Sequence, residues 1–355
     1  MSTEHTTTPE IEAVQDSLVL THNTEPIMTT PEPAHLPVLR QLGVALGLLI
    51  FVFLTSYTGT VIALLTKPTN EESDIIVSAK LVESSETPHT ENPFDSVGIE
   101  GEAGFVWDVR EQTILFNKNA DVSLPLASIT KLMTALVAYE LLEDGSTIDV
   151  TINAIKADGD SGMRDGEVFS LKNITDMVLI ASSNDGAMAL AEAAGNSIEG
   201  AIDPNELFVH AMNIRAEELG LLETHFYNPT GLDISQTEPG AVSSARDVAH
   251  LLEYIITNYP SVVNFTTLES ARVYAETGEH FDIENTNSII SEIDGLIASK
   301  TGYTDLAGGN LVIAFDAGLA RPIIVVVLGS TYNGRFSDVL MLSNAARAFI
   351  TTGSE

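Results

Sequence analysis

Apolar residues recur at helical spacing in several stretches of the chain, and the most regular stretch runs from residue 128 to residue 145. Its apolar side chains follow the three-and-four spacing of a buried helix face, and a glycine follows the last of them. Residues 176–182, 187–195 and 336–350 form further apolar stretches. The spacing predicts a helix at each place. The apolar positions of the first stretch are Ile129, Leu132, Met133, Leu136, Val137, Leu141 and Leu142.

Short runs rich in valine, isoleucine and leucine near the C-terminus predict strands. Residues 296–302 form a short run that ends at a glycine, and residues 311–315 and 323–328 form two more. The connection between the last two, residues 316–322, contains glycine and proline, which favour a hairpin turn. Helical and strand patterns together predict an α/β fold.

The first 95 residues differ from the rest in composition. Residues 1–40 are rich in Thr, Pro and Glu without a sustained apolar period, which predicts a disordered tail. Residues 42–65 are nearly uncharged, and about 24 residues of helix extend about 36 Å, enough to cross a hydrocarbon core of about 30 Å. The long preceding tail and the lack of a clear small-x-small site favour an uncleaved transmembrane anchor over a signal peptide. Residues 66–95 then form a linker, and residues 96–352 the folded domain.

Charge and composition exclude several classes of function. Fifty Asp and Glu residues against 16 Lys and Arg give a net charge of −34, which argues against nucleic acid as a partner. The chain has no cysteine, so disulfides and thiolate chemistry are excluded. Its eight histidines show no metal-ligand spacing. We therefore expect neither a metal nor another cofactor.

Ser128 and Lys131 stand at the start of the first predicted helix. Residues three apart share a helix face, with Cβ atoms roughly 5–6 Å apart, so Lys131 can reach the Ser128 hydroxyl. A serine hydroxyl is a weak nucleophile until a neighbouring base takes its proton, and a lysine can act as that base only where burial or a second cation keeps it neutral. The helix N-terminus also supplies N–H groups for an oxyanion. Taken alone, the pair is better explained by an ordinary N-cap serine and a solvated lysine.

Two further short motifs follow in the sequence. Ser182 and Asn184 lie in a polar break between apolar helical stretches, where a hydroxyl could pass on a proton and an amide could hold the lysine and a substrate amide. Lys300, Thr301 and Gly302 end the first predicted strand. On an edge strand, the lysine would supply charge for a carboxylate and the threonine a hydrogen bond, and the glycine would allow close approach of a substrate backbone. A plain N-cap serine and a solvated lysine are the alternatives.

The order S-x-x-K, S-x-N, K-T-G is the motif set of penicillin-binding proteins and class A β-lactamases. From about Val97 to about Ala348, the chain resembles the D-alanyl-D-alanine carboxypeptidases of the low-molecular-weight penicillin-binding protein family (peptidase S11). The segments that carry the resemblance are 104–121, 124–136, 162–192, 226–233, 243–252 and 295–309. Ser183 and Tyr303 depart from the residues common in the family.

The resemblance implies a serine DD-carboxypeptidase that removes the terminal D-alanine of peptidoglycan stem peptides and is acylated by β-lactams. Its oxyanion hole would use the backbone N–H groups of the nucleophile and of the residue after K-T-G. The implied site residues are Ser128 (acylated nucleophile), Lys131 (base), Ser182 and Asn184 (proton transfer and positioning), and Lys300, Thr301, Gly302 and Tyr303 (substrate binding).

The implied fold is an antiparallel sheet flanked by helices, plus an all-helical subdomain that carries Ser182, with the site between the two. The implied location is a bacterial cell membrane, with residues 42–65 as a single anchor and the domain outside. The charges of Arg40 and Lys67 flank this segment symmetrically, so they do not orient it.

Three other functions share the same motifs. A DD-endopeptidase would cleave D-alanine cross-links at the same site, and the sequence does not separate it from a carboxypeptidase. A serine β-lactamase would add fast deacylation, for which class A enzymes use a glutamate and a held water; no E-x-x-L-N-type segment lies between the second and third motifs. A non-catalytic membrane protein that binds peptidoglycan or β-lactams is the remaining alternative.

Overall fold

The computed structural model describes residues 92–159 and 161–352. The predicted tail (1–40), the predicted transmembrane segment (42–65) and all but the last residues of the predicted linker lie outside these residues. Within the described ranges, no helix combines the length and the hydropathy that a membrane span requires.

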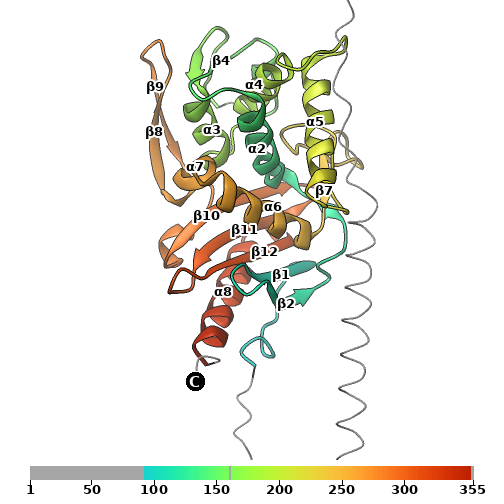
Figure 1. Ribbon diagram of the computed structural model, residues 1–355, viewed down its shortest axis with the longest axis vertical. Coiled ribbons are helices and arrows are strands. Elements are labelled where there is room, and N and C mark those ends of the chain that lie inside the picture. Colours follow the sequence, from blue (N-terminus) through green and yellow to red (C-terminus); the bar gives the residue numbers. More distant parts are fainter. Residues whose placement is uncertain (1–91, 160, 353–355) are drawn as a thin grey trace, which may run out of the picture. The chain divides into compact units, whose positions relative to one another are not determined.

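A five-stranded antiparallel sheet forms the centre of the domain (Figure 1). Its order is β10 (Leu296–Thr304), β11 (Gly308–Asp316), β12 (Pro322–Ser330), β1 (Ala103–Asp108) and β2 (Thr113–Lys118). The central strands are apolar at almost every position because both faces are covered: alternate side chains of β12 enter two different hydrophobic clusters. Strand β10 lies at an edge, as the sequence predicted for the Lys300 strand.

One face of the sheet is covered by α8 (Gly334–Thr352), as the apolar stretch 336–350 predicted. The other face carries α6 (Ala245–Asn258) and the helical part of the domain (Figure 1). That part consists of α2 (Lys131–Leu141), α3 (Leu171–Ile180), α4 (Asn184–Gly195), α5 (Pro204–Glu218) and the short α7 (Pro260–Val263). The predicted α/β architecture with a helical subdomain is therefore confirmed. This subdomain also contains small hairpins, so it is not entirely helical.

Short elements complete the domain. The two-stranded sheets are β4 (Thr147–Asp149) with β5 (Val168–Ser170) and β8 (Ser270–Tyr274) with β9 (His280–Glu284), and the three-stranded one joins β3 (Leu124–Pro125), β7 (Ala241–Ser243) and β6 (His225–Phe226). The 3₁₀ turns are η1 (Ala127–Thr130), η2 (Ala154–Lys156), η3 (Asn264–Thr267) and η4 (Ile290–Glu292).

Two predicted boundaries were wrong. Helix α3 begins at residue 171 rather than 176, because Ser170 caps it by accepting a hydrogen bond from the backbone N–H of Asn173 (3.2 Å). Strand β10 continues two residues past Gly302, because Tyr303 and Thr304 still pair with β11. The chain turns at residues 305–307 and enters β11 at Gly308, whose φ of +62° lies in the left-handed region. The K-T-G residues therefore lie within the strand, not at its end.

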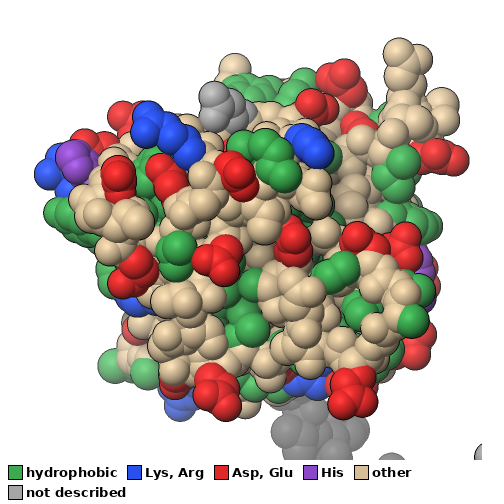
Figure 2. Space-filling model, turned by 90° about the horizontal axis from the view of Figure 1, so that it is seen from above, with side chains coloured by type: hydrophobic (Ala, Val, Ile, Leu, Met, Phe, Trp, Pro, Cys, Tyr) green, Lys and Arg blue, Asp and Glu red, His purple; other side chains and the backbone are tan. Residues whose placement is uncertain are grey.

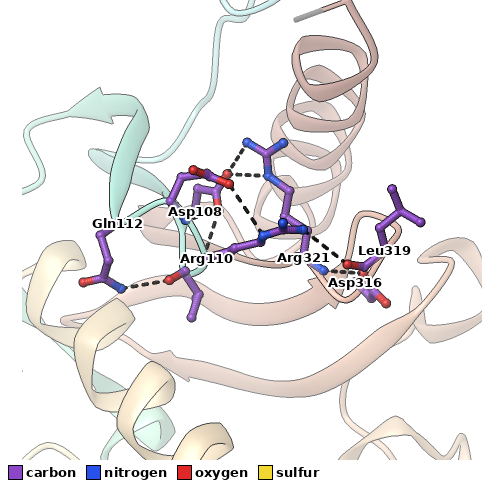
Figure 3. Close-up of polar contacts among 8 residues, drawn as sticks. Asp108, Arg110, Gln112, Asp316, Leu319 and Arg321 are labelled. Carbon is purple, nitrogen blue, oxygen red and sulfur yellow. Dashed lines mark hydrogen bonds and ion pairs between the residues drawn. The ribbon is translucent and has the colours of Figure 1, made fainter. Parts of the chain in front are cut away.

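A buried ion pair holds the β11–β12 hairpin against the turn that joins β1 to β2 (Figure 3). The Asp108 carboxylate is fully buried and accepts from Arg321 Nε at 2.7 Å. Its other oxygen accepts the backbone N–H groups of Arg110 and Glu111 at 3.1 and 3.0 Å. Both oxygens of this buried carboxylate are thus satisfied by close donors.

Candidate active site

Ser128 lies in the 3₁₀ turn η1 immediately before α2, so the first turn of the predicted helix is wound more tightly than an α-helix. Ala127, its neighbour, has φ +49°, an uncommon conformation for a residue with a Cβ atom. A Cβ atom added to Gly231 would lie 1.9 Å from the Ala127 carbonyl oxygen, so the neighbouring loop presses closely on this turn. The strained backbone is held in place by its surroundings, which is typical of functional sites.

Lys131 Nζ lies within hydrogen-bond distance of three oxygen atoms. It is 2.7 Å from Ser128 Oγ, 2.7 Å from Asn184 Oδ1 and 2.9 Å from the Thr230 carbonyl oxygen. Asn184 presents its oxygen rather than its nitrogen, because its Nδ2 donates to the Asp158 carbonyl. Two of the three neighbours can therefore only accept, and Nζ donates to both.

The third neighbour, the Ser128 hydroxyl, can itself donate. A neutral amine has two N–H groups and one lone pair, so a neutral Lys131 would donate to Asn184 and Thr230 and accept the Ser128 proton. Lys131 is fully buried, and no carboxylate bonds to it in the described residues. Burial, reinforced by the nearby charge of Lys300, lowers the pKa of Lys131 well below its usual 10.5. The predicted neutral lysine is therefore favoured by its environment.

The second motif connects α3 to α4. Ser182 has φ +61°, and Ser183 then caps α4 by accepting from the Gly186 N–H at 2.9 Å. The N-cap expected as an alternative role for this motif thus exists, but it belongs to Ser183, which leaves the Ser182 hydroxyl available. Ser182 Oγ instead accepts a hydrogen bond from Lys300 Nζ at 3.0 Å. Ser182 is thus the second residue of the site, after Ala127, with a strained left-handed backbone.

Lys300 is 1% exposed, which rules out the solvated edge-strand lysine. Besides Ser182, its Nζ donates only to the Thr301 carbonyl (3.0 Å), and no carboxylate neutralises it among the described residues. Burial, followed by the charge of Arg335, lowers the pKa of Lys300 to about 7. A buried cation without an acid is a receptor for an anion brought by a ligand.

Gly302 has a packing role that the sequence did not predict. A Cβ atom there would lie 2.7 Å from the Leu126 carbonyl oxygen and 3.2 Å from the Ser128 backbone nitrogen. The glycine thus lets β10 pack against the nucleophile segment. Its role in admitting a substrate backbone stays a prediction. Thr301, on the opposite face of the strand, shares a 2.6 Å hydrogen bond with the hydroxyl of Thr286.

Sequence reasoning missed three contributors to the site. The Thr230 carbonyl reaches Lys131 because Asn228 Oδ1 accepts the N–H of Gly231 at 2.7 Å and so folds the loop. The signal for that turn was the Asn-Pro-Thr-Gly segment. Arg335, from α8, donates to the Gly302 carbonyl at 2.7 Å, and Thr286 supports Thr301; neither position carried a local signal.

Residues from all three predicted motifs thus lie together: Lys131 joins the first motif to Asn184 of the second, and Lys300 joins the third to Ser182 of the second. Tyr303 follows Gly302 on the strand that packs against the nucleophile turn, and the Tyr303 side chain is half exposed. No group of three or more His, Asp or Glu side chains in the described ranges has the arrangement of a metal site.

Comparison with known proteins gives a consistent picture. Residues 88–331 match the family model described as D-alanyl-D-alanine carboxypeptidase, peptidase S11. The chain is 34% identical over 239 residues to the D-alanyl-D-alanine carboxypeptidase DacF of Bacillus subtilis, an alignment that covers 66% of this chain and 58% of that protein. It is 31% identical over 280 residues to a D-alanyl-D-alanine endopeptidase of Pseudomonas aeruginosa, which covers 78% and 84% of the two chains.

Among solved structures, penicillin-binding protein D2 of Listeria monocytogenes in its ampicillin-bound form is similar to this chain. Its TM-score is 0.58 at 28% identity, and the match covers 70% of this chain and 98% of that one.

Proposed function

Because the chain belongs to the D-alanyl-D-alanine carboxypeptidase family, peptidase S11, we propose that it is a serine-type DD-carboxypeptidase that acts on peptidoglycan stem peptides. The observation that carries the proposal is the placement of Lys131 Nζ, 2.7 Å from Ser128 Oγ and between two acceptors that use its N–H groups. This arrangement favours a lysine that takes the serine proton.

Acylation then follows from the geometry. Ser128 Oγ attacks the carbonyl carbon of the terminal D-Ala-D-Ala bond while its proton passes to Lys131 Nζ. The carbonyl oxygen becomes an oxyanion, for which we assign the backbone N–H groups of Ser128 and Tyr303. The C–N bond breaks as the leaving nitrogen receives a proton through Lys131 and the Ser182 hydroxyl. Water then attacks the ester carbonyl carbon and gives a proton to Lys131, which returns it to Ser128 Oγ as the ester C–O bond breaks.

Substrate recognition rests on Lys300 and Thr301. The terminal carboxylate would supply the negative charge that Lys300 lacks in the described residues, and Thr301 would add a hydrogen bond. Many acidic side chains lie on the face seen in Figure 2, and the chain carries a net charge of −34. Binding of an anionic peptide therefore depends on this local cationic site rather than on the overall field. A β-lactam, whose strained amide resembles the scissile bond, is expected to acylate Ser128.

We further propose that residues 42–65 anchor the chain in a bacterial cell membrane, with the catalytic domain outside. Support comes from the length and low charge of that segment and from the extracytoplasmic position of the proposed substrate. Protease protection of a C-terminally tagged chain in intact cells and in inverted vesicles would test the orientation.

The decisive experiment is mass spectrometry of the full-length chain with a stem pentapeptide that ends in D-Ala-D-Ala. We expect the wild type to release one alanine and Ser128→Ala to release none. An intact peptide, together with the absence of a penicillin adduct on Ser128, would overturn the proposal.

The same assay separates two neighbouring functions. Cleavage of cross-linked dimers but not of pentapeptides would indicate a DD-endopeptidase, which the match to the Pseudomonas endopeptidase makes worth testing. Hydrolysis of penicillin within seconds, instead of a stable adduct, would indicate a β-lactamase.

A further inference from the structure

Two tyrosines form an exposed aromatic pair next to the candidate site. Tyr303 follows the K-T-G residues on β10, and Tyr332 lies in the turn between β12 and α8. Their rings meet edge to face, with centroids 5.1 Å apart, and the two residues are 47% and 55% exposed. Large apolar rings that stay half exposed at the edge of a site are suited to covering a ligand.

The pair is fixed to the same framework as the K-T-G segment. The Arg335 guanidinium lies over the Tyr332 ring, 4.5 Å from its centroid, and donates to the Gly302 carbonyl at 2.7 Å. Arg335 is 3% exposed, so this contact is buried. The position of Tyr332 relative to β10 is therefore determined by packing rather than by a free side chain.

Strand alternation places Tyr303 beside the carboxylate receptor. Lys300 and Gly302 lie on the face of β10 that contacts Ser182 and the nucleophile turn. Thr301 and Tyr303 lie on the other face, about 6.6 Å apart along the strand. Because β10 is an edge strand, a carboxylate at its open edge can be reached from both faces, by Lys300 and by Thr301. The residue that carries this carboxylate is the one that leaves, and on the Thr301 side its neighbour along the strand is Tyr303.

We propose that Tyr303 and Tyr332 form a wall that contacts the side chain of the leaving residue and favours leaving residues with longer aliphatic side chains. The inference rests on the proposed peptidase function and deepens it. In a carboxypeptidase substrate the leaving residue is D-alanine, whose methyl group reaches little of the wall. In a cross-linked substrate the leaving residue carries a long side chain, which could cover both rings.

The expected effect is moderate. Each methylene removed from water contributes roughly a three- to fourfold preference when fully buried. The two rings cover only one side of the leaving residue's aliphatic side chain. Three additional methylenes should therefore change the preference for that residue about tenfold in total.

Two peptides with the same acyl part, one ending in D-Ala-D-Ala and the other in D-Ala-D-norleucine, provide the test. The measured quantity is the ratio of kcat/KM for the norleucine peptide to kcat/KM for the alanine peptide. We expect Tyr303→Ala and Tyr332→Ala each to lower this ratio about threefold, and the double variant to lower it about tenfold. Tyr332→Phe, which retains the ring, should preserve the ratio. Tyr274→Ala removes a tyrosine of similar exposure (51%) from β8 and is the matched control.

Each result is decisive. A ratio that stays at the wild-type value in both alanine variants, or falls equally in the Tyr274 control, overturns the wall while leaving the peptidase function intact. A wild type that cleaves neither peptide overturns the proposed function and the wall with it. Unfolding midpoints and penicillin acylation rates of the variants show whether they fold. An unchanged ratio in a folded, acylated variant counts against the wall.

Discussion

Two of the regions of this domain that contain buried charges differ in how those charges are compensated. At the β11–β12 hairpin, the buried Asp108 carboxylate is paired with Arg321 and accepts two backbone N–H groups (Figure 3). At the candidate active site, Lys131 and Lys300 are as deeply buried, yet their hydrogen-bond partners in the described residues are neutral.

The difference shows what each region is for. A buried ion pair whose groups are all satisfied supports the structure, and removing one partner strands the other. Two buried lysines without an acidic partner lower the stability of the fold, because burial disfavours the charged form of each lysine. The arrangement persists because favourable interactions in the rest of the domain outweigh this free-energy cost. It leaves one lysine able to take a proton and the other able to bind an anion.

Lys131→Met should give the largest effect, because it removes the proposed base but keeps a side chain of similar length. We expect the rate of acylation by penicillin to fall about 10³-fold, the loss typical for removal of a general base. The free energy of unfolding should not decrease, because the variant also removes the cost of keeping a buried lysine neutral. Acylation kinetics with a fluorescent penicillin and urea denaturation measure the two quantities. A variant that acylates at the wild-type rate would exclude Lys131 as the base.

Arg321→Met makes the opposite change at the hairpin and should mainly affect stability. Because it leaves Asp108 buried without its cation, we expect a loss of about 3 kcal/mol in the free energy of unfolding. Arg110→Met is the matched control. The Arg110 side chain is exposed and makes a 3.6 Å surface pair with Glu111 and an exposed 3.5 Å hydrogen bond to the Leu319 carbonyl, so the variant should cost less than about 1 kcal/mol. Equal losses in urea denaturation would contradict the distinction between the two arginines.

Lys300→Met should stabilise the domain while impairing recognition of the substrate. At pH 6, where Lys300 is charged in both folded and unfolded chains, we expect a gain of roughly 1–3 kcal/mol. The folded-state pKa is about 7, below the ordinary 10.5, so unfolding takes up a proton between these values and wild-type stability rises with pH. The advantage of the variant should therefore shrink from pH 7 to pH 10.5. A constant advantage in urea titrations would show that the pKa of Lys300 is not lowered.

The pH dependence of kcat/KM should show the smallest effect. This ratio reports the free enzyme, in which Lys300 loses its proton near pH 7. We expect kcat/KM for a carboxylate-terminated peptide to decline about tenfold per pH unit above that value. A substrate whose terminal carboxylate is amidated should lack this decline. The same decline for both substrates would assign it to another group.

Much of this arrangement was predictable because it is local. The three-residue spacing of Ser128 and Lys131 fixed their contact, and the need for a neutral base predicted burial or a second cation; the structure has both. The helix over 336–350 and the strands around 311–328 followed from their apolar patterns.

The rest depends on contacts between distant parts of the chain. Arg335 lies 33 residues from Gly302 and the Thr230 carbonyl 99 residues from Lys131, and no periodicity encodes such pairs. The packing role of Gly302 was missed because the contact of β10 with the nucleophile turn was not visible in the sequence. The predicted membrane segment and the proposed roles of the site residues stay predictions.

The most direct test of the uncompensated lysines is an NMR pH titration of the chain labelled with ¹³C at lysine Cε. Lys131→Met and Lys300→Met assign the two signals. We predict that Lys300 titrates near pH 7 and that Lys131 titrates well below 10.5. If both signals titrate near 10.5, the lysines are ordinary ammonium groups, and neither the neutral base nor the distinction between the two regions stands.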